Sequence, residues 1–255
     1  MIRIGHVERR VQVENKTILI VGASSGIGKA CAEKLDGENN RLVLLARNRT
    51  KLNELAEKIS CETLVISYDL AQVENIKEVF DEIKEKHWKL DGMVYSAGVD
   101  ANCPFKVNSI RMLQQTMMIN CFSFFEMSKF FYSTQYSNKG ASIVAISSIA
   151  SEICMPGQGP YTASKAAMNA GVKTMAKEFV RRKIRVNAVL PAGVLTPMAE
   201  KKAEVFCDIH TTEKAKSEQT LGEISPESVA DSVCFLLSEQ AKFVTGELLK
   251  ITSGI

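Results

Sequence analysis

The chain has 255 residues, of which 45% are hydrophobic and 24% charged, and its formal net charge is +3. This composition is typical of a globular protein and excludes collagen-like, disulfide-scaffold and disordered classes. The small charge predicts neither nucleic acid nor a membrane as a partner, and the apolar runs are too short to cross a bilayer. Residues 1–14, with Arg3, Arg9 and Arg10 and without the apolar core of a secretory signal, are expected to be a solvated lead-in.

Short β-type apolar runs alternate with stretches of helical periodicity from residue 17 onward. The expected strands are Thr17–Gly22, Leu42–Ala46, Thr63–Ser67, Gly92–Ser96, Ser142–Ser147, Ile184–Leu190 and Glu247–Ile251. The expected helices are Gly26–Leu35, Lys51–Ile59, Val73–Lys86, Met112–Tyr136, Tyr161–Arg182 and Pro226–Ser238. Several strands are continuous apolar runs, which favours parallel strands covered on both faces. We therefore expect an α/β fold, a doubly wound seven-stranded parallel sheet, in a single domain over residues 15–255.

The segment from Met198 to Gly222 is the weakest for regular structure. It is charged and follows a strand end, at the carboxyl edge of the sheet where such folds bind ligands. We expect it to be a lid. Together with Asp100–Phe105 and Ile149–Gln158 it is expected to form a variable pocket wall.

Cysteine and histidine usage argues against disulfides and metal. The seven Cys, at positions 31, 61, 103, 121, 154, 207 and 234, form no closely spaced pair, and most lie among apolar residues. This pattern favours buried free thiols in a reducing compartment, the cytoplasm. The three His (His6, His87 and His210) are isolated from one another and from Cys, so no metal site is expected.

A glycine-rich turn, GASSGIG, follows the first expected strand and precedes a helix. Glycines there allow a tight turn, let the backbone approach a pyrophosphate and let the helix pack on the sheet. The spacing is GxxxGxG, and a purely structural turn would look the same. The residues expected to contact a nucleotide are Gly22, Ser24, Ser25, Gly26, Ile27 and Gly28.

The end of the second strand bears on the choice of nucleotide. Proteins that select NAD usually place Asp or Glu about 20 residues beyond the turn, where this chain has Arg47. A guanidinium at that point can bind the 2′-phosphate of NADP(H) through paired hydrogen bonds, or it can simply be solvated. Asp69, after the third strand, is placed either to accept from the adenine amino group or to cap a helix.

A phenol and an ammonium lie at i and i+4 on one helix, as Tyr161 and Lys165. Tyrosine has a reference pKa near 10, so it is a poor acid or base unless a neighbouring cation stabilises its anion. Ser148 lies thirteen residues before Tyr161, at the end of an expected strand. The carboxyl edge of this architecture is where catalytic groups are expected.

With these residues in view, the chain resembles the short-chain dehydrogenase/reductase family, in its compact single-domain branch, from about Asn15 to Gly254. The resemblance also covers Asp69, Tyr95-Ser96-Ala97-Gly98, Asn120, Pro191, Thr196 and Thr245-Gly246. The family usually has Asn-Asn-Ala-Gly where this chain has Tyr95-Ser96-Ala97-Gly98.

The resemblance implies a Rossmann-type fold and a catalytic set of four residues. Tyr161 would donate the proton to a carbonyl, and Ser148 would hydrogen-bond the substrate oxygen. Lys165 would bind the nicotinamide ribose and depress the pKa of Tyr161. Asn120 would hold a water that relays protons to Lys165, although alone it also fits a polar residue satisfied inside a helix. Further cofactor contacts are implied for Leu70, Ala97, Gly98, Tyr161, Lys165, Pro191, Val194 and Thr196.

The expected helix Met112–Tyr136 carries more apolar surface than one sheet contact requires. In this family it commonly packs across a dyad with the helix of Tyr161. We expect a homodimer or homotetramer, with an entirely intramolecular core helix as the alternative.

These observations predict an NADPH-dependent carbonyl reductase, most like a 3-oxoacyl-[acyl-carrier-protein] reductase, with a small-molecule or carrier-bound substrate. Basic residues at Lys139 and Arg181, Arg182 and Lys183 fit either docking of an acidic carrier or a solvated helix end. The alternative is an NAD(P)-dependent dehydrogenase of a sugar or another secondary alcohol. A nucleotide sensor would be expected to lose Tyr161 or Lys165, and a serine hydrolase using Ser148 would need a nearby His.

Overall fold

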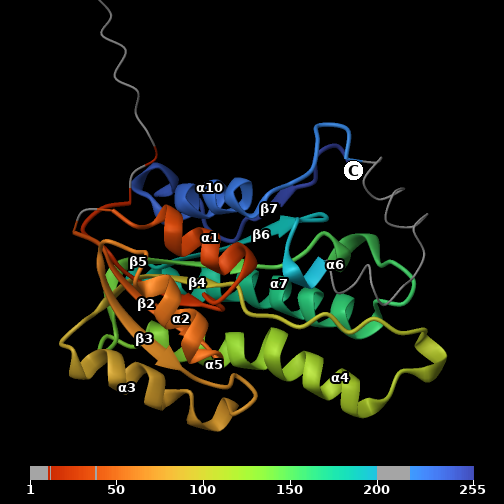
Figure 1. Cartoon of the computed structure of the whole chain (residues 1–255), viewed down its shortest axis with the longest axis horizontal. Coiled ribbons are helices and arrows are strands. Elements are labelled where there is room, and N and C mark those ends of the chain that lie inside the picture. Colours follow the sequence, from red (N-terminus) through yellow and green to blue (C-terminus); the bar gives the residue numbers. More distant parts are fainter. Residues whose placement is uncertain (1–10, 12, 38, 200–218) are drawn as a thin grey trace, which may run out of the picture.

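A computed structural model describes residues 11, 13–37, 39–199 and 219–255 and contains one sheet of seven parallel strands. The strand order is β3-β2-β1-β4-β5-β6-β7, so the chain winds outward from β1 and then returns to add β4 on its other side (Figure 1). The strands are β1 (Thr17–Val21), β2 (Arg41–Ala46), β3 (Glu62–Ser67), β4 (Leu90–Tyr95), β5 (Ser137–Ile146), β6 (Arg185–Pro191) and β7 (Leu248–Ile251). The expected doubly wound α/β fold is confirmed.

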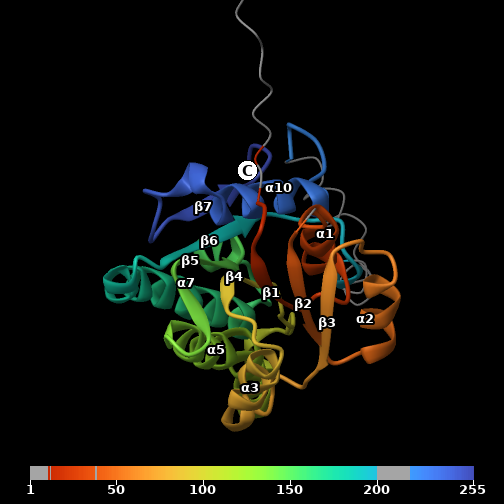
Figure 2. The same ribbon diagram turned by 90° about the vertical axis from the view of Figure 1, so that its left-hand side faces the viewer.

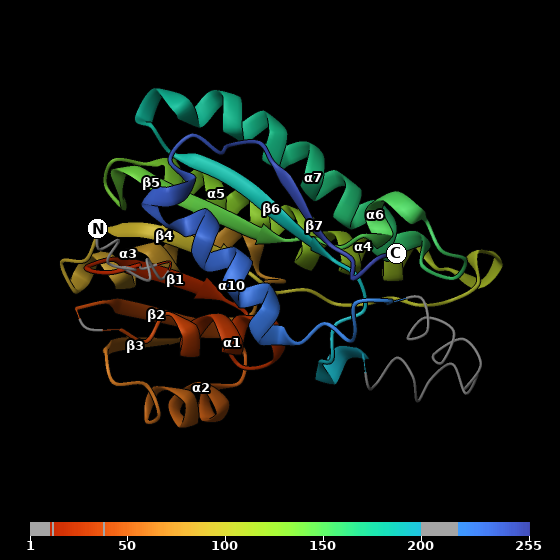
Figure 3. The ribbon, with the colours of Figure 1, turned by 90° about the horizontal axis from the view of Figure 1, so that it is seen from above.

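Helices cover both faces of the sheet (Figure 2). On one face lie α1 (Gly26–Lys34), α2 (Arg49–Ala56) and α10 (Pro226–Leu237). On the other lie α3 (Lys77–Glu85), α5 (Ser123–Tyr132) and α7 (Gly159–Phe179). The helices α4 (Ile110–Met117) and α6 (Ala150–Ile153) lie toward the carboxyl end of the sheet, where the strand arrows point in Figure 3.

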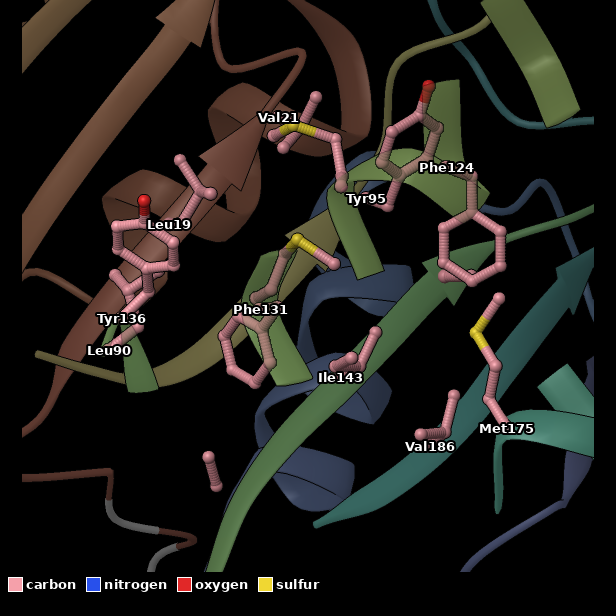
Figure 4. Close-up of a cluster of buried hydrophobic side chains, with 14 of the residues drawn as sticks. Leu19, Val21, Leu90, Tyr95, Phe124, Phe131, Tyr136, Ile143, Met175 and Val186 are labelled. Atoms are coloured by element: carbon pink, nitrogen blue, oxygen red, sulfur yellow. The ribbon is translucent and has the colours of Figure 1, made fainter. Parts of the chain in front are cut away.

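The pleat of each central strand divides its apolar side chains between two cores. In β1, Ile18 and Ile20 pack against α1 and α10, whereas Leu19 and Val21 pack on the side of α3, α5 and α7. Figure 4 shows the second core, in which Leu19, Val21 and Phe124 are fully buried. Each such side chain contributes about 1.5–3 kcal/mol through burial, so the carboxyl ends of the strands are held on a rigid support.

The expected helix over Met112–Tyr136 is divided in the structure. It begins as α4, widens into a π-turn at Met118–Phe122, continues as α5, and ends at Tyr132. Ser133 adopts an extended backbone, and residues 133–136 form a turn that leads into β5. That strand starts at Ser137, earlier than expected, through a register shift opposite Leu90 and Gly92.

The described Cys residues are all free, and Cys31, Cys121 and Cys234 are buried whereas Cys154 is exposed. Within the described ranges no cluster of His, Cys, Asp and Glu is placed to hold a metal ion. Nor does a helix in those ranges have the length and apolar character needed to cross a membrane. Most of the lead-in, Cys207, His6, His210 and most of the expected lid at 198–222 lie outside the described residues.

Candidate active site

The loops that follow the parallel strands enclose a cavity of about 700 Å³, a size typical of cofactor and substrate sites. It lies at the carboxyl edge, where β1 and β4 lead into loops on either side of the switch in strand order. Of the residues that sequence analysis singled out, the following line it: Gly22, Ser24, Ser25, Gly26, Ile27, Arg47, Asp69, Leu70, Ala97, Gly98, Ser148, Tyr161, Lys165, Pro191, Val194 and Thr196. Gly28 and Asn120 do not line the cavity, but each lies against a residue that does: Gly28 against Gly22, and Asn120 beside Gly98.

The three glycines of the GASSGIG turn each meet a different steric demand. Gly22 has a φ of +89°, and a Cβ there would lie 2.7 Å from the amide nitrogen of Ala97. A Cβ on Gly28 would lie 2.2 Å from the carbonyl oxygen of Gly22. Gly26 has a φ of +55° and faces the side chain of Thr196. The turn is therefore a backbone cradle at the start of α1, which fits the pyrophosphate of a dinucleotide.

The end of β2 places a cation at one end of the cavity. Arg47 is exposed, and no described residue forms an ion pair with its guanidinium. The neighbouring lining residues Ala46 and Asn48 are not acidic. Asp69 lines the cavity nearby and accepts a hydrogen bond from the amide of Ala71, rather than capping a helix.

Tyr161 and Ser148 lie side by side at the opposite end of the cavity. Tyr161 is in the first turn of α7, and Ser148 follows β5, where its Oγ accepts from the amide of Ala150 at 3.1 Å. Burial raises the pKa of Tyr161 to about 12; the Ser148 hydroxyl lowers this pKa and Asp100 raises it further. Tyr161 therefore keeps its proton throughout the neutral range.

Lys165 lies one helical turn beyond Tyr161, with its Nζ 5.8 Å from the centre of the tyrosine ring. The ammonium donates to the carbonyl of Ile146 at 2.8 Å. Burial lowers the pKa of Lys165 to about 8, and the charges of Asp100 and Cys121 oppose this shift. The expectation that Lys165 depresses the pKa of Tyr161 is not met in this structure, because burial of the phenol dominates.

Asn120 is fully buried in the π-turn and clamps the loop that follows β4. Its Oδ1 accepts from the amide of Val99 at 2.8 Å, and its Nδ2 donates to the Val99 carbonyl at 2.9 Å. The same Nδ2 donates to Ser164 Oγ at 3.0 Å, one residue before Lys165. A Cβ on Gly98 would lie 3.4 Å from Asn120 Oδ1 and 3.5 Å from Lys165 Nζ, so the two groups flank this glycine.

The wall beside Tyr161 is mainly apolar. Its apolar residues are Ile149, Ile153, Met155, Leu195, Met198 and Ile255. Charged groups that line the described part of the cavity here are the Lys165 ammonium and the carboxylates of Asp100 and Glu223, and Gln158 adds a buried amide. The segments 100–105 and 149–158 were expected here, although of the first only Asp100 lines the cavity. Leu195 lies between Val194 and Thr196, both expected contacts, whereas Ile255 was not expected, because only the fold brings it to this edge.

Comparison with known proteins gives consistent matches over nearly the whole chain. A family model described as enoyl-(acyl carrier protein) reductase matches residues 22–255. The chain is 31% identical to a 3-oxoacyl-[acyl-carrier-protein] reductase of Thermotoga maritima, over 96% of this chain and 99% of the relative. It is 32% identical to an NAD-dependent glycerol dehydrogenase of Listeria innocua, over 97% and 96%. The solved aldohexose dehydrogenase of Thermoplasma acidophilum superposes with a TM-score of 0.82 at 28% identity, covering 94% of each chain.

The lowered pKa of Lys165 predicts a specific dependence of stability on pH. Its pKa of about 8 in the folded chain lies below the ordinary 10.5, so between these values the unfolded chain binds more protons. The free energy of unfolding should therefore rise with pH across this window. Relative to Lys165→Met, the wild-type chain should gain about 2 kcal/mol between pH 8 and pH 10 in urea unfolding. Parallel curves for the two proteins would contradict this burial effect.

Proposed function

Since the chain belongs to the short-chain dehydrogenase/reductase family, an oxidoreductase family acting on alcohol and ketone groups, we propose that it is an NADPH-dependent carbonyl reductase. In this proposal it acts like the 3-oxoacyl-[acyl-carrier-protein] reductases, to one of which it is 31% identical. The observation that carries the proposal is the meeting of Tyr161, Ser148 and Lys165 in the cavity that also holds the glycine cradle.

The reaction reduces a ketone to a secondary alcohol. When bound, the reduced nicotinamide supplies the hydride. Ser148 Oγ hydrogen-bonds the carbonyl oxygen and steadies the charge that develops there. Tyr161 donates its phenolic proton to that oxygen, and its raised pKa keeps the proton available at neutral pH.

Lys165 and Asn120 prepare the site for the next turnover. The Lys165 ammonium, near the Tyr161 ring, binds the nicotinamide ribose and lies on the path by which a proton returns to the phenolate left after proton transfer. Asn120 holds the water through which Lys165 regains a proton. Residues 15–255 act as one domain in this proposal, with the two ends of the cavity serving cofactor and substrate.

The apolar wall supports an uncharged substrate with an apolar chain. Ile153, Met155 and Leu195 offer contact to a chain beside the carbonyl. An apolar wall of this kind fits the acyl chain of a 3-oxoacyl thioester or ester.

A polyol or sugar dehydrogenase is the second candidate, since the Listeria innocua relative is named an NAD-dependent glycerol dehydrogenase. Asp100 and Gln158 would then accept and donate hydrogen bonds to hydroxyl groups.

Docking of an acidic carrier protein has less basic surface available than the sequence suggested. Arg182 donates to the carbonyls of Tyr132 and Ser137, so its guanidinium serves the fold. Lys139, Arg181 and Lys183 remain for an encounter with a carrier. The free thiols support a location in the reducing cytoplasm.

Arg47 is expected to select the cofactor. In Arg47→Ala, NADPH should bind about 10- to 100-fold more weakly, because a charge-assisted contact to the 2′-phosphate is lost, while NADH affinity changes less than about twofold. Nicotinamide fluorescence titration measures both affinities. Arg49→Ala is the matched control, since Arg49 is exposed but does not line the cavity. Equal loss in the two variants, or a wild-type preference for NADH, would refute the role of Arg47.

Tyr161→Phe separates a reductase from a nucleotide sensor. Reduction of ethyl acetoacetate or acetoacetyl thioester should fall about 10²- to 10⁴-fold with NADPH affinity retained, because a general acid is removed. Tyr68→Phe is the control, since Tyr68 lines the cavity but its hydroxyl donates to Gln72. A faster oxidation of glycerol or glucose by the wild-type chain would favour the second candidate. Full activity in Tyr161→Phe would exclude the proposed chemistry.

We also propose a homodimer or homotetramer. The exposed faces of α4, the π-turn and α5 carry Ile110, Phe122 and Phe125, respectively, which a partner copy would cover. Light scattering at micromolar concentration should give two or four times the 28.1 kDa chain mass. Phe122→Lys should shift that mass toward the monomer, whereas Phe243→Lys, at an exposed Phe away from these helices, should not. A monomeric wild-type mass would contradict the proposal.

A further inference from the structure

The π-turn between α4 and α5 changes the hydrogen bonding of one carbonyl. The backbone N–H of Ser123 donates to the carbonyl of Met118, five residues earlier. In an α-helix the same N–H would donate to the carbonyl of Ile119. The Ile119 carbonyl therefore needs another donor inside a buried part of the protein.

Two buried hydroxyls lie within hydrogen-bond distance of the Ile119 carbonyl. Tyr95 Oη lies 2.7 Å from the Ile119 carbonyl oxygen and Ser123 Oγ lies 2.8 Å from it, each in position to donate. The two hydroxyl oxygens are 2.5 Å apart. Each hydroxyl has one hydrogen, so when one donates to the other, the second donates to the carbonyl, and the three oxygens form one network. Both residues are fully buried, and the Tyr95 ring packs edge-on against Phe124 with centroids 5.2 Å apart (Figure 4).

The same turn carries Asn120, the residue after Ile119. The amide of Asn120 clamps Val99, and Tyr95 ends the strand that leads to Val99. The end of β4 is thus tied to two successive residues of the turn, once through the Tyr95 hydroxyl and once through the backbone of Val99. Each residue in an α-helix adds about 100° of rotation, and the π-turn holds one residue more than an α-helical turn. Conversion of the π-turn to an α-helical turn would therefore rotate α4 relative to α5. Asn120 would then lose its hydrogen bonds to Val99.

We propose that Tyr95 is a positioning residue, whose hydroxyl holds the π-turn open and thereby fixes Asn120 beside Lys165. The inference rests on the proposed function insofar as it assigns Asn120 to the proton path.

Tyr95→Phe and Tyr136→Phe form a matched pair. Both tyrosines are buried in the same core. The Tyr136 hydroxyl donates a hydrogen bond to Asp81 at 2.7 Å, and Tyr136 does not line the cavity. In Tyr95→Phe the kcat for ketone reduction should fall about tenfold, while the KM for NADPH changes less than about twofold. The remaining Ser123 hydroxyl keeps the loss partial. Tyr136→Phe should change kcat less than about twofold.

A double-mutant cycle tests whether Tyr95 acts through Asn120. In the Asn120→Ala background, Tyr95→Phe should lower kcat by less than about twofold, since the group it positions is absent. A full tenfold loss in that background, or equal kinetics in the two Phe variants, would overturn the proposal.

Amide hydrogen exchange provides a readout that needs no substrate. The N–H of Val99 donates to Asn120 Oδ1, so its exchange should accelerate at least about tenfold in Tyr95→Phe and stay unchanged in Tyr136→Phe. Unchanged exchange at Val99 in both variants would overturn the role of Tyr95. If the wild-type chain reduces no ketone, the proposed function fails and exchange at Val99 still decides this inference.

Discussion

The close approach of two loops, the one after β1 and the one after β4, is the constraint on which the site depends. Parallel pairing of Val21 with Tyr95 brings Gly22 against Ala97, at a distance that leaves no room for a Cβ. This contact fixes the glycine turn after β1 against the loop after β4 that contains Val99. The proposed nucleotide site is therefore built on one pair of neighbouring strand ends, whereas Ser148 and Tyr161 come from the end of β5 and from α7.

Most of the framework follows from local sequence. Continuous apolar runs identify the buried parallel strands, and the glycine turn between β1 and α1 marks the backbone cradle at the start of α1. The cavity also joins Ser148, Tyr161 and Lys165, which the chain separates by as much as seventeen positions. These features were predictable because each depends on residues close in sequence or on a motif of fixed spacing.

Features that depend on distant partners were not predictable in this way. The hydroxyl of Tyr95, which we propose holds the π-turn open, lies 24 positions before Ile119. The periodicity of Met112–Tyr136 alone therefore predicts one uninterrupted helix. The raised pKa of Tyr161 is similar, since the i, i+4 spacing to Lys165 suggests a lowered value and burial by the folded chain reverses it. Both cases show tertiary surroundings overriding a local rule.

Gly171 lies in α7, ten residues beyond Tyr161, and does not line the cavity. A Cβ there would lie 2.4 Å from the ring of Phe125. The Phe125 ring of α5 can therefore pack against α7 here only because Gly171 has no side chain. At 1.5 Å per residue, this contact lies about 15 Å along α7 from Tyr161. A side chain at Gly171 would have to displace the Phe125 ring, which lies on the apolar surface proposed to contact a second copy. Gly171 thus couples the packing of α7, the helix that carries Tyr161, to the surface through which copies of this chain would associate.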